Sequence, residues 1–168
     1  MSNQLENVVK QQQEQANSLN SSDQKDENII QLVGFIVGNE EFAVPILSIQ
    51  EIIKPIEWTK VPFTADSVLG VFNLRGNVLP LIDLRKKFSA SEAEFDDDVR
   101  FIVIKVGDEL AGFVIDRLTE ALRIEANSIL PPPDTSIERD AVIEGIARKE
   151  DRIITILKIN ALLKSNNG

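Results

Sequence analysis

Two stretches of apolar residues interrupted by a polar turn stand out along the chain. QLVGFIVGNEEFAVP, residues 31–45, reads as two strands rich in Val, Ile and Phe around a turn at residues 38–40. RFIVIKVGDELAGFVI, residues 100–115, repeats this pattern around residues 107–109. Branched and aromatic side chains favour strands, and glycine beside a polar residue favours the reversal between them. Both stretches are therefore predicted to be β-hairpins.

The two hairpins belong to a longer internal repeat. Their turn glycines, Gly38 and Gly107, lie 107 − 38 = 69 residues apart. The same offset places residues 49–53 on residues 118–122. Further along, VLPLIDL matches IITILKI at an offset of 153 − 78 = 75, as if six residues had entered a loop of the second copy. Several segments that match in order with one insertion indicate a duplication.

The repeat predicts a mainly β fold with short helices. Two similar halves, residues 29–88 and 99–163, are joined by the acidic connector 89–98 within one domain, residues 29–168. Several short strands with turn signals in each half suit a small closed or partly closed barrel. The junction of two such units commonly forms a groove in which a ligand or a partner helix can lie.

Residues 1–28 differ in composition from the rest of the chain. They are rich in Gln, Asn and Ser and carry few apolar side chains, too few to offset the entropy cost of ordering the segment. We predict a disordered polar tail. Leu5, Val8 and Val9 have the i, i+3, i+4 spacing of one helix face, which leaves a short helix as the alternative.

Composition narrows the class of partner. The excess of Asp and Glu gives a net charge of −9, which disfavours nucleic acid and anionic membrane surfaces. The chain has no Cys and no His, so disulfides are absent and a zinc site is close to excluded. The first residues lack the basic and apolar regions of a secretion signal, and no apolar run is long enough to span a membrane. We expect a cytoplasmic protein without direct membrane insertion.

Catalytic chemistry has few candidate residues. Without His or Cys only carboxylates, lysines and hydroxyls remain, and the sequence has neither a nucleophile elbow nor a phosphate-binding loop. Asp83 follows the apolar run VLPLI and precedes LRKKF, so it can serve as a carboxylate catalyst or as the cap of a short helix. Residues 96–98 are three aspartates without the spacing of a calcium loop, which indicates a solvated connector. No cofactor and no metal are predicted.

Arg75 occupies the turn of the strand pair VFNLRGNVLPLIDL. Gly76 and Asn77 tolerate turn conformations, so Arg75 can be an ordinary solvated turn residue. The matching turn of the second half reads RKED, however, so the repeat itself does not require arginine here. A long planar donor on a rigid hairpin is well suited to bind carboxylates or carbonyls of a partner. Residues 131–134, PPPD, can be a polyproline ligand or a rigid spacer within the second half.

From about Ile29 to Leu163 the chain resembles the CheW family of bacterial chemotaxis coupling proteins. The resemblance rests on ILSIQEI, GVFNLRGNVLPLIDLRKKF, VGDELAGFVIDRL, NSILPPPD and IEGIARKEDRIITILKINALL. It implies two five-stranded, SH3-like β-barrels. It also implies a non-catalytic adaptor, without a cofactor, that joins chemoreceptors to the histidine kinase CheA through the CheW-like regulatory domain of that kinase.

The resemblance assigns receptor contacts to Arg75, Ile49 and Glu51. Our hypothesis is that the apolar helical tip of a chemoreceptor lies between the two barrels, where Ile49 supplies buried area. Arg75 and Glu51 then fix the orientation of the receptor.

Kinase contacts are implied for Val78 in the first half and for Pro133 and Asp134 in the second. Some relatives carry a basic residue before the proline run and an aromatic residue after the acid, whereas this chain has Leu130 and Thr135. The alternatives that remain are a specialised CheW-like scaffold of another receptor pathway, as in the related CheV proteins, and a carboxylate enzyme centred on Asp83.

Overall fold

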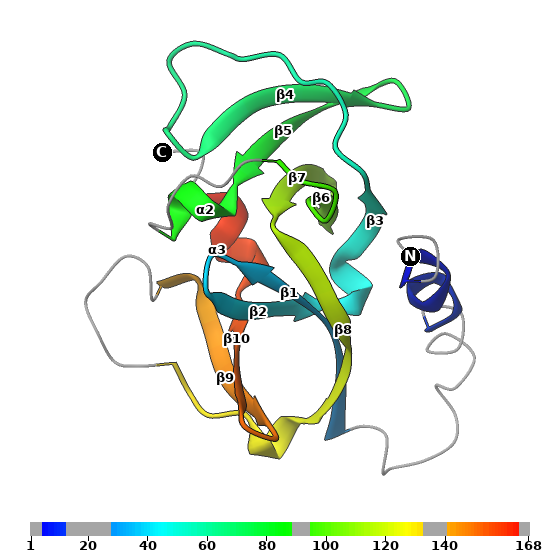
Figure 1. Ribbon diagram of the computed structural model, residues 1–168, viewed down its shortest axis with the longest axis vertical. Coiled ribbons are helices and arrows are strands. Elements are labelled where there is room, and N and C mark those ends of the chain that lie inside the picture. The colour runs from blue at the N-terminus through cyan, green and yellow to red at the C-terminus, as the bar shows by residue number, and fades with distance from the viewer. Residues whose placement is uncertain (1–4, 13–27, 89–94, 133–140, 165–168) are drawn as a thin grey trace.

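Ten strands in two five-stranded sheets make up most of the fold in the computed structural model, which describes residues 5–12, 28–88, 95–132 and 141–164. Sheet A has the order β8-β1-β2-β10-β9 and contains β1 (Ile29–Val37), β2 (Glu40–Pro45), β8 (Arg117–Glu125), β9 (Ile143–Lys149) and β10 (Arg152–Leu157). Sheet B has the order β3-β6-β7-β5-β4 and contains β3 (Ile49–Ile53), β4 (Val68–Leu74), β5 (Asn77–Asp83), β6 (Arg100–Val106) and β7 (Glu109–Ile115). Figure 1 shows β4 and β5 at one end of the molecule and β9 and β10 at the other.

Short helices connect or end these strands. They are η2 (Ile46–Ser48), α2 (Leu84–Lys87), η3 (Ala126–Ser128) and α3 (Ile159–Lys164). The predicted mainly β fold with short helices is confirmed, and the two predicted hairpins are β1-β2 and β6-β7. Among the described residues, none of the helices is both long and apolar enough to cross a bilayer.

Each sheet takes strands from both halves of the repeat. Sheet A combines β1 and β2 with the last three strands of the chain, whereas sheet B combines β6 and β7 with β3, β4 and β5. This differs from the prediction that residues 29–88 and 99–163 each form a separate barrel. The chain leaves the first hairpin through η2 and enters the other sheet, where β3 pairs with β6. Hairpins are encoded locally, but the sheet that a later strand joins depends on long-range packing.

The exchange of strands follows the internal repeat. In sheet B, β5 pairs in parallel with β7 and aligns Leu81 with Gly112. In sheet A, β10 pairs in parallel with β2 and aligns Ile156 with Ala43. These partners differ by 156 − 81 = 75 and 112 − 43 = 69 residues, the two offsets read from the sequence. The two sheets are therefore structural copies, each completed by strands of the other half.

Three hydrophobic clusters hold the sheets. We call the first the central core: it contains residues of both sheets, including Phe35, Phe42 and Phe113. Two smaller clusters belong to sheet A and to sheet B alone. Neighbouring strand residues alternate between them, as Leu32 belongs to the sheet A cluster and Val33 to the central core. Both faces of the strands are buried, which explains why the sequence shows nearly continuous apolar runs.

Part of the N-terminal segment is ordered. Residues 5–12 form a helix, and Val9, only 6% exposed, belongs to the central core. The prediction of a disordered tail over residues 1–28 is therefore wrong for this stretch. The spacing of Leu5, Val8 and Val9, noted as the alternative, is the signal that fits the structure. Burial of the Val9 side chain in the central core supplies stabilisation that the few apolar residues of this segment did not suggest.

Candidate functional site

Arg75 and Glu51 lie together at one end of sheet B. Arg75 occupies the turn between β4 and β5, and its Nη2 lies 2.9 Å from Oε1 of Glu51 on β3. β3 and β4 are the two outer strands of sheet B, so the ion pair joins its opposite edges. The Arg75 side chain is 77% exposed and that of Glu51 22%. Two predicted receptor-contact residues thus form one charged site on the surface.

The backbone of this turn is left-handed. Arg75 has φ +52° and Gly76 has φ +88°, and Oδ1 of Asn73 accepts the N–H of Gly76 at 3.0 Å. Residues with a side chain rarely adopt positive φ. Glu150, the equivalent of Arg75 at an offset of 75, has φ +57° in the turn between β9 and β10. The repeat therefore preserves the turn conformation, whereas the residue at this turn position is a cation, Arg75, in sheet B and an anion, Glu150, in sheet A.

Ile49 is not available as a surface anchor. Its side chain is 2% exposed and belongs to the central core, and its backbone pairs with Ile104 of β6. This corrects the role predicted for Ile49, because a buried core side chain cannot contact a partner in the folded protein. The exposed apolar residue nearby is Leu47 of η2, 66% exposed.

Leu47 was not predicted as a contact residue, because no helix was expected at η2. In a 3₁₀ helix residues three apart lie on the same side, so Ile46 and Ile49 both point into the core. Leu47 lies between them in sequence and faces solvent. The run ILSI carries the signal, since two isoleucines three residues apart with an isolated leucine between them fit one turn of helix better than a strand.

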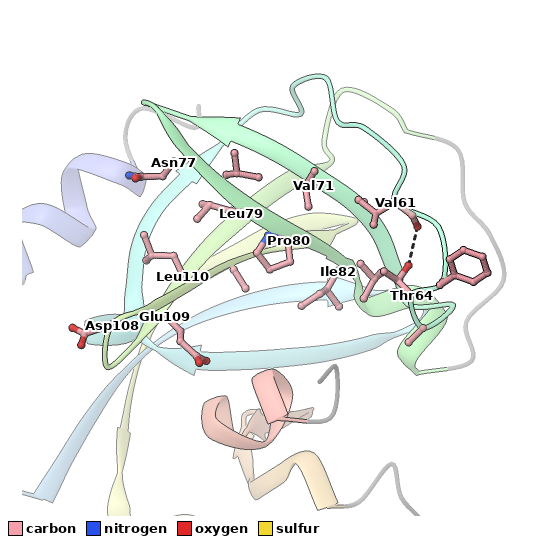
Figure 2. Close-up of a pocket in the computed structure, with 16 residues that line it drawn as sticks. Val61, Thr64, Val71, Asn77, Leu79, Pro80, Ile82, Asp108, Glu109 and Leu110 are labelled. Carbon is pink, nitrogen blue, oxygen red and sulfur yellow. Dashed lines mark hydrogen bonds between the residues drawn. The ribbon is translucent and has the colours of Figure 1, made fainter. Parts of the chain in front are cut away.

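Val78 lies on an exposed apolar surface of sheet B. It belongs to β5 and is 66% exposed. It lines an open cavity of about 750 Å³ between β5, the β6-β7 turn and the loop of residues 54–67. Figure 2 shows Leu79, Pro80 and Ile82 of β5 along this cavity. Phe63, fully exposed with φ +63°, also lines it.

The other predicted kinase contacts, Pro133 and Asp134, lie outside the described residues. The repeat nevertheless gives Val78 a counterpart on sheet A. Ile153 of β10, at an offset of 153 − 78 = 75, is 59% exposed. The two sheets therefore present exposed apolar residues at equivalent positions.

Asp83 is a structural carboxylate. It is buried at the end of β5, where its Oδ1 accepts the backbone N–H of Arg85 at 2.9 Å and caps α2. The same carboxylate binds the buried Arg85 guanidinium, with 3.1 Å between Nε and Oδ1. The predicted capping role is confirmed. A carboxylate enclosed in this way has no access to a substrate, and the part of the chain that the structure describes holds no cluster of three or more metal-ligating side chains.

The Asp83–Arg85 pair also connects the sheets. Nη1 of Arg85 lies 3.6 Å from Oδ1 of Asp116, at the junction of β7 and β8. The other oxygen of Asp116 accepts the N–H of Gly38 at 2.7 Å, in the β1-β2 turn of sheet A. One buried guanidinium and two carboxylates therefore join α2, which follows sheet B, to the first hairpin of sheet A.

Sheet A carries a counterpart of the Arg75–Glu51 pair. Glu120 on β8 is equivalent to Glu51 at an offset of 69, and it accepts hydrogen bonds from Arg152 at 2.9 Å and Lys149 at 3.2 Å. Arg152 also binds Glu41 of β2 through Nε at 3.0 Å and Nη2 at 2.6 Å. The hydrogen bonds from Arg152 and Lys149 lower the pKa of Glu120, and those to Glu41 and Glu120 raise the pKa of Arg152.

Comparison with known proteins identifies relatives over the whole fold. The CheW-like domain family matches residues 31–167. The chemotaxis protein CheW of Helicobacter pylori is 47% identical over 166 residues, which cover 99% of each chain. CheW of Klebsiella aerogenes is 33% identical over 78% of this chain and 80% of its own. The crystal structure of the scaffolding protein TtCheW from Thermoanaerobacter tengcongensis matches with a TM-score of 0.71 and 35% identity, covering 77% of this chain and 84% of that one.

Proposed function

The chain belongs to the CheW-like family, and we propose that it is a non-catalytic chemotaxis adaptor that couples methyl-accepting chemoreceptors to the histidine kinase CheA. Its relatives are named chemotaxis and scaffolding proteins. Burial of Asp83 in a capping and ion-pair role removes the carboxylate that we considered for catalysis. Recruitment to membrane-bound receptor arrays would then depend on protein contacts alone.

The main observation in support of the proposed receptor site is the contact between Arg75 and Glu51. These residues were assigned to receptor binding separately, and they meet at 2.9 Å from strands at opposite edges of sheet B. Arg75 remains mostly exposed, so several of its five donor N–H groups face solvent and can bind carbonyls or carboxylates at the end of a receptor helix.

Apolar contact must come from Leu47 instead of Ile49. Burial of an exposed leucine contributes about 1.5 to 3 kcal/mol. A solvent-exposed ion pair contributes about 0 to 1 kcal/mol. Leu47 therefore sets much of the affinity for a receptor helix, while Arg75 and Glu51 select its orientation.

The kinase surface that we propose includes Val78 and the cavity beside it. Val78 is three residues from Arg75 on the same hairpin, and the cavity extends from there across β5 toward the loop of residues 54–67. Pro133 and Asp134 provide the second kinase contact in this proposal. Separate surfaces for receptor and kinase allow modest individual contacts to reinforce one another in an array.

A binding experiment with purified components tests this function. A chemoreceptor cytoplasmic fragment and the regulatory domain of CheA are titrated with the adaptor, each alone and then together. We expect Arg75→Glu to weaken binding of the receptor fragment and to leave binding of the kinase domain unchanged. Arg148→Glu, an equal charge reversal at an exposed position on β9, is the matched control.

Two results would contradict the site assignment. If Arg75→Glu abolishes the cooperative thermal melt, then Arg75 is needed for folding. If Arg75→Glu and Arg148→Glu bind the receptor fragment equally well, then Arg75 is not a receptor contact. Absence of binding to both components in the unmodified protein would reject the adaptor function itself.

A further inference from the structure

Three aromatic rings from three segments of the chain pack together beside sheet B. Trp58 lies in the loop of residues 54–67, Phe95 in the connector and Phe101 on β6. The ring centroid of Trp58 lies 5.3 Å from that of Phe95 and 6.2 Å from that of Phe101. Phe95 in turn lies 6.3 Å from Phe101, edge to face. We call the contact between Trp58 and Phe95 the aromatic clasp.

The clasp rests on two buried residues. Phe101 is 0% exposed and belongs to the sheet B cluster. Cζ of the buried Arg85 lies 5.2 Å from the ring centroid of Phe95, a cation–π contact. Arg85 is itself held by the carboxylates of Asp83 and Asp116. Aromatic pairs and cation–π contacts favour defined geometries, so Phe95 fixes the Trp58 ring against a rigid part of the fold.

Trp58 stands at the start of a cavity wall. The next residue, Thr59, exchanges two backbone hydrogen bonds of 2.8 Å with Val71 of β4. The loop residues that follow and line the cavity are Val61, Phe63, Thr64 and Ala65. Figure 2 shows Val61 and Thr64 here, joined by a hydrogen bond of 3.2 Å within the loop.

The wall is poorly held by its own side chains. Residues 62–66 are all exposed, and Phe63 is fully so. Exposed loop segments with little buried apolar area open at low cost in free energy. The arrangement of the wall therefore depends on the contacts that fix the loop on either side of it. Before the wall these are the clasp and the bonds of Thr59, and after it the carbonyl of Ser67 accepts the N–H of Asp83 at 2.7 Å.

We propose that Phe95 is a positioning residue for the kinase-binding cavity. Through Trp58 it holds the wall of residues 61–65 in the arrangement that the regulatory domain of CheA binds. The inference rests on the proposed kinase surface at Val78 and the cavity. If loss of the clasp leaves the wall in this arrangement in about one molecule of five, the apparent affinity for the kinase domain falls about fivefold.

A binding experiment with the full chain tests the role of Phe95. The probes are the purified regulatory domain of CheA and a chemoreceptor cytoplasmic fragment. Phe95→Ala removes the ring, and Phe95→Tyr keeps it. Ile56→Ala is the matched control, because Ile56 lies on the same loop and is 38% exposed, as Phe95 is. We expect Phe95→Ala to bind the kinase domain about fivefold more weakly and the receptor fragment unchanged, and the other two variants to bind both as the unmodified protein does.

Fluorescence of the adaptor alone reports the clasp directly. Trp58 is the one tryptophan of the chain, which has no tyrosine. Phe95→Ala should shift the emission to longer wavelength and make acrylamide quenching more efficient, whereas Phe95→Tyr and Ile56→Ala should not. A double variant, Trp58→Ala with Phe95→Ala, should bind the kinase domain no more weakly than the weaker of the two single variants, because both act through one contact.

The outcomes separate positioning from direct contact and from folding. Weaker kinase binding by Phe95→Ala with unchanged Trp58 emission, or losses that multiply in the double variant, would mean that Phe95 contacts the kinase itself. Unchanged kinase binding despite shifted emission would mean that the wall does not need the clasp. Loss of the cooperative melt in Phe95→Ala, followed by circular dichroism, or an equal loss of receptor binding would make Phe95 a folding residue. Each of these results rejects the inference and leaves the adaptor function standing, whereas failure of the unmodified protein to bind the kinase domain rejects both.

Discussion

Arg75 and Glu51 are 24 residues apart in sequence, yet Nη2 of Arg75 lies 2.9 Å from Oε1 of Glu51. The contact connects β3, one outer strand of sheet B, with the turn that follows β4, the other outer strand. In sheet A, Glu120 and Arg152 make the corresponding contact between β8 and the β9-β10 hairpin. A glutamate on the third strand of each copy therefore binds a cation on the hairpin that follows it. In sheet A the cation is well anchored, whereas in sheet B Arg75 extends into solvent.

The ion pairs of Glu120 with Arg152 and Lys149 in sheet A make the free energy of unfolding depend on pH. Hydrogen bonds from Arg152 and Lys149 lower the pKa of Glu120 below its ordinary value of 4.5. The stabilisation is therefore present above about pH 4.5 and is lost as pH falls toward the lower pKa of the folded state. Because the Glu120 side chain is 42% exposed, solvent screens these ion pairs, and we expect the contribution to stay below about 1 kcal/mol.

Urea unfolding at pH 7 and at pH 3 checks this prediction. The proteins compared are the unmodified protein and Glu120→Gln. The difference in free energy of unfolding between the two proteins should shrink at pH 3. Glu109→Gln, at an exposed position in the β6-β7 hairpin, is the control. A difference that is the same at both pH values would show that the charge of Glu120 does not act in this network.

Gly70 is required by the loop that crosses β4. Thr59 and Val71 exchange two backbone hydrogen bonds of 2.8 Å, which bring the carbonyl of Thr59 against Gly70. A Cβ on Gly70 would collide with the Thr59 carbonyl oxygen and lie 2.7 Å from its carbon. Since backbone on both sides must move, we expect Gly70→Ala to lower the free energy of unfolding by at least about 2 kcal/mol.

Gly107→Ala is the comparison for this substitution. Gly107 also has positive φ, +60°, but no atom lies within 4 Å of a Cβ placed there. Its substitution costs left-handed strain of about 1 to 2 kcal/mol and no collision. Chemical denaturation of both variants measures the difference. If Gly70→Ala lowers the free energy of unfolding less than Gly107→Ala does, then the β3-β4 loop moves at little cost to accommodate the added Cβ.

Local features of the fold were predictable and long-range ones were not. The hairpin turns at Gly38 and Gly107 and the cap by Asp83 depend on residues close in sequence, and the repeat offsets follow from direct comparison of the two halves of the sequence. The exchange of strands between the halves depends on which sheet accepts β3, and the apolar pattern of β3 is the same in either case. Burial of Ile49 follows from that exchange, because pairing with β6 turns its side chain into the central core.

The receptor site was predictable in part for the same reason. Arg75 was recognised from its turn and from the resemblance, and it is exposed. Its contact with Glu51 could not be read from the sequence, because it requires sheet B to bring its two edges together. For Val9 the prediction was wrong in the other direction. The few apolar residues of its segment predicted disorder, but Val9 packs into the central core of the domain.

Asp83 is expected to matter for stability and not for chemistry. Asp83→Ala removes the α2 cap and leaves the Arg85 guanidinium buried with only Asp116 as a carboxylate partner at 3.6 Å. Breaking one side of a buried ion pair typically costs about 3 to 5 kcal/mol. Asp108→Ala, in the exposed β6-β7 turn, should change the free energy of unfolding by less than about 0.5 kcal/mol. Equal urea midpoints for the two variants would contradict the structural role of Asp83.

Leu47 and Ile49 provide the sharpest separation of binding from folding. They are two residues apart, but Leu47 is exposed and Ile49 is in the central core. We expect Ile49→Ala to lower the free energy of unfolding by about 2 to 5 kcal/mol through the cavity that it leaves. Leu47→Ser should leave the melt nearly unchanged and weaken binding of a chemoreceptor cytoplasmic fragment about tenfold, because a buried apolar contact is lost at the interface.

Paired thermal melts and titrations measure both effects. The exposed Ile153 on β10 offers a control, since Ile153→Ser removes an apolar side chain of similar exposure from sheet A. If Leu47→Ser and Ile153→Ser weaken receptor binding equally, the contact at η2 has no special role. If Leu47→Ser destabilises the fold as much as Ile49→Ala, the exposed position of Leu47 in η2 is wrong, and receptor binding must be sought away from η2.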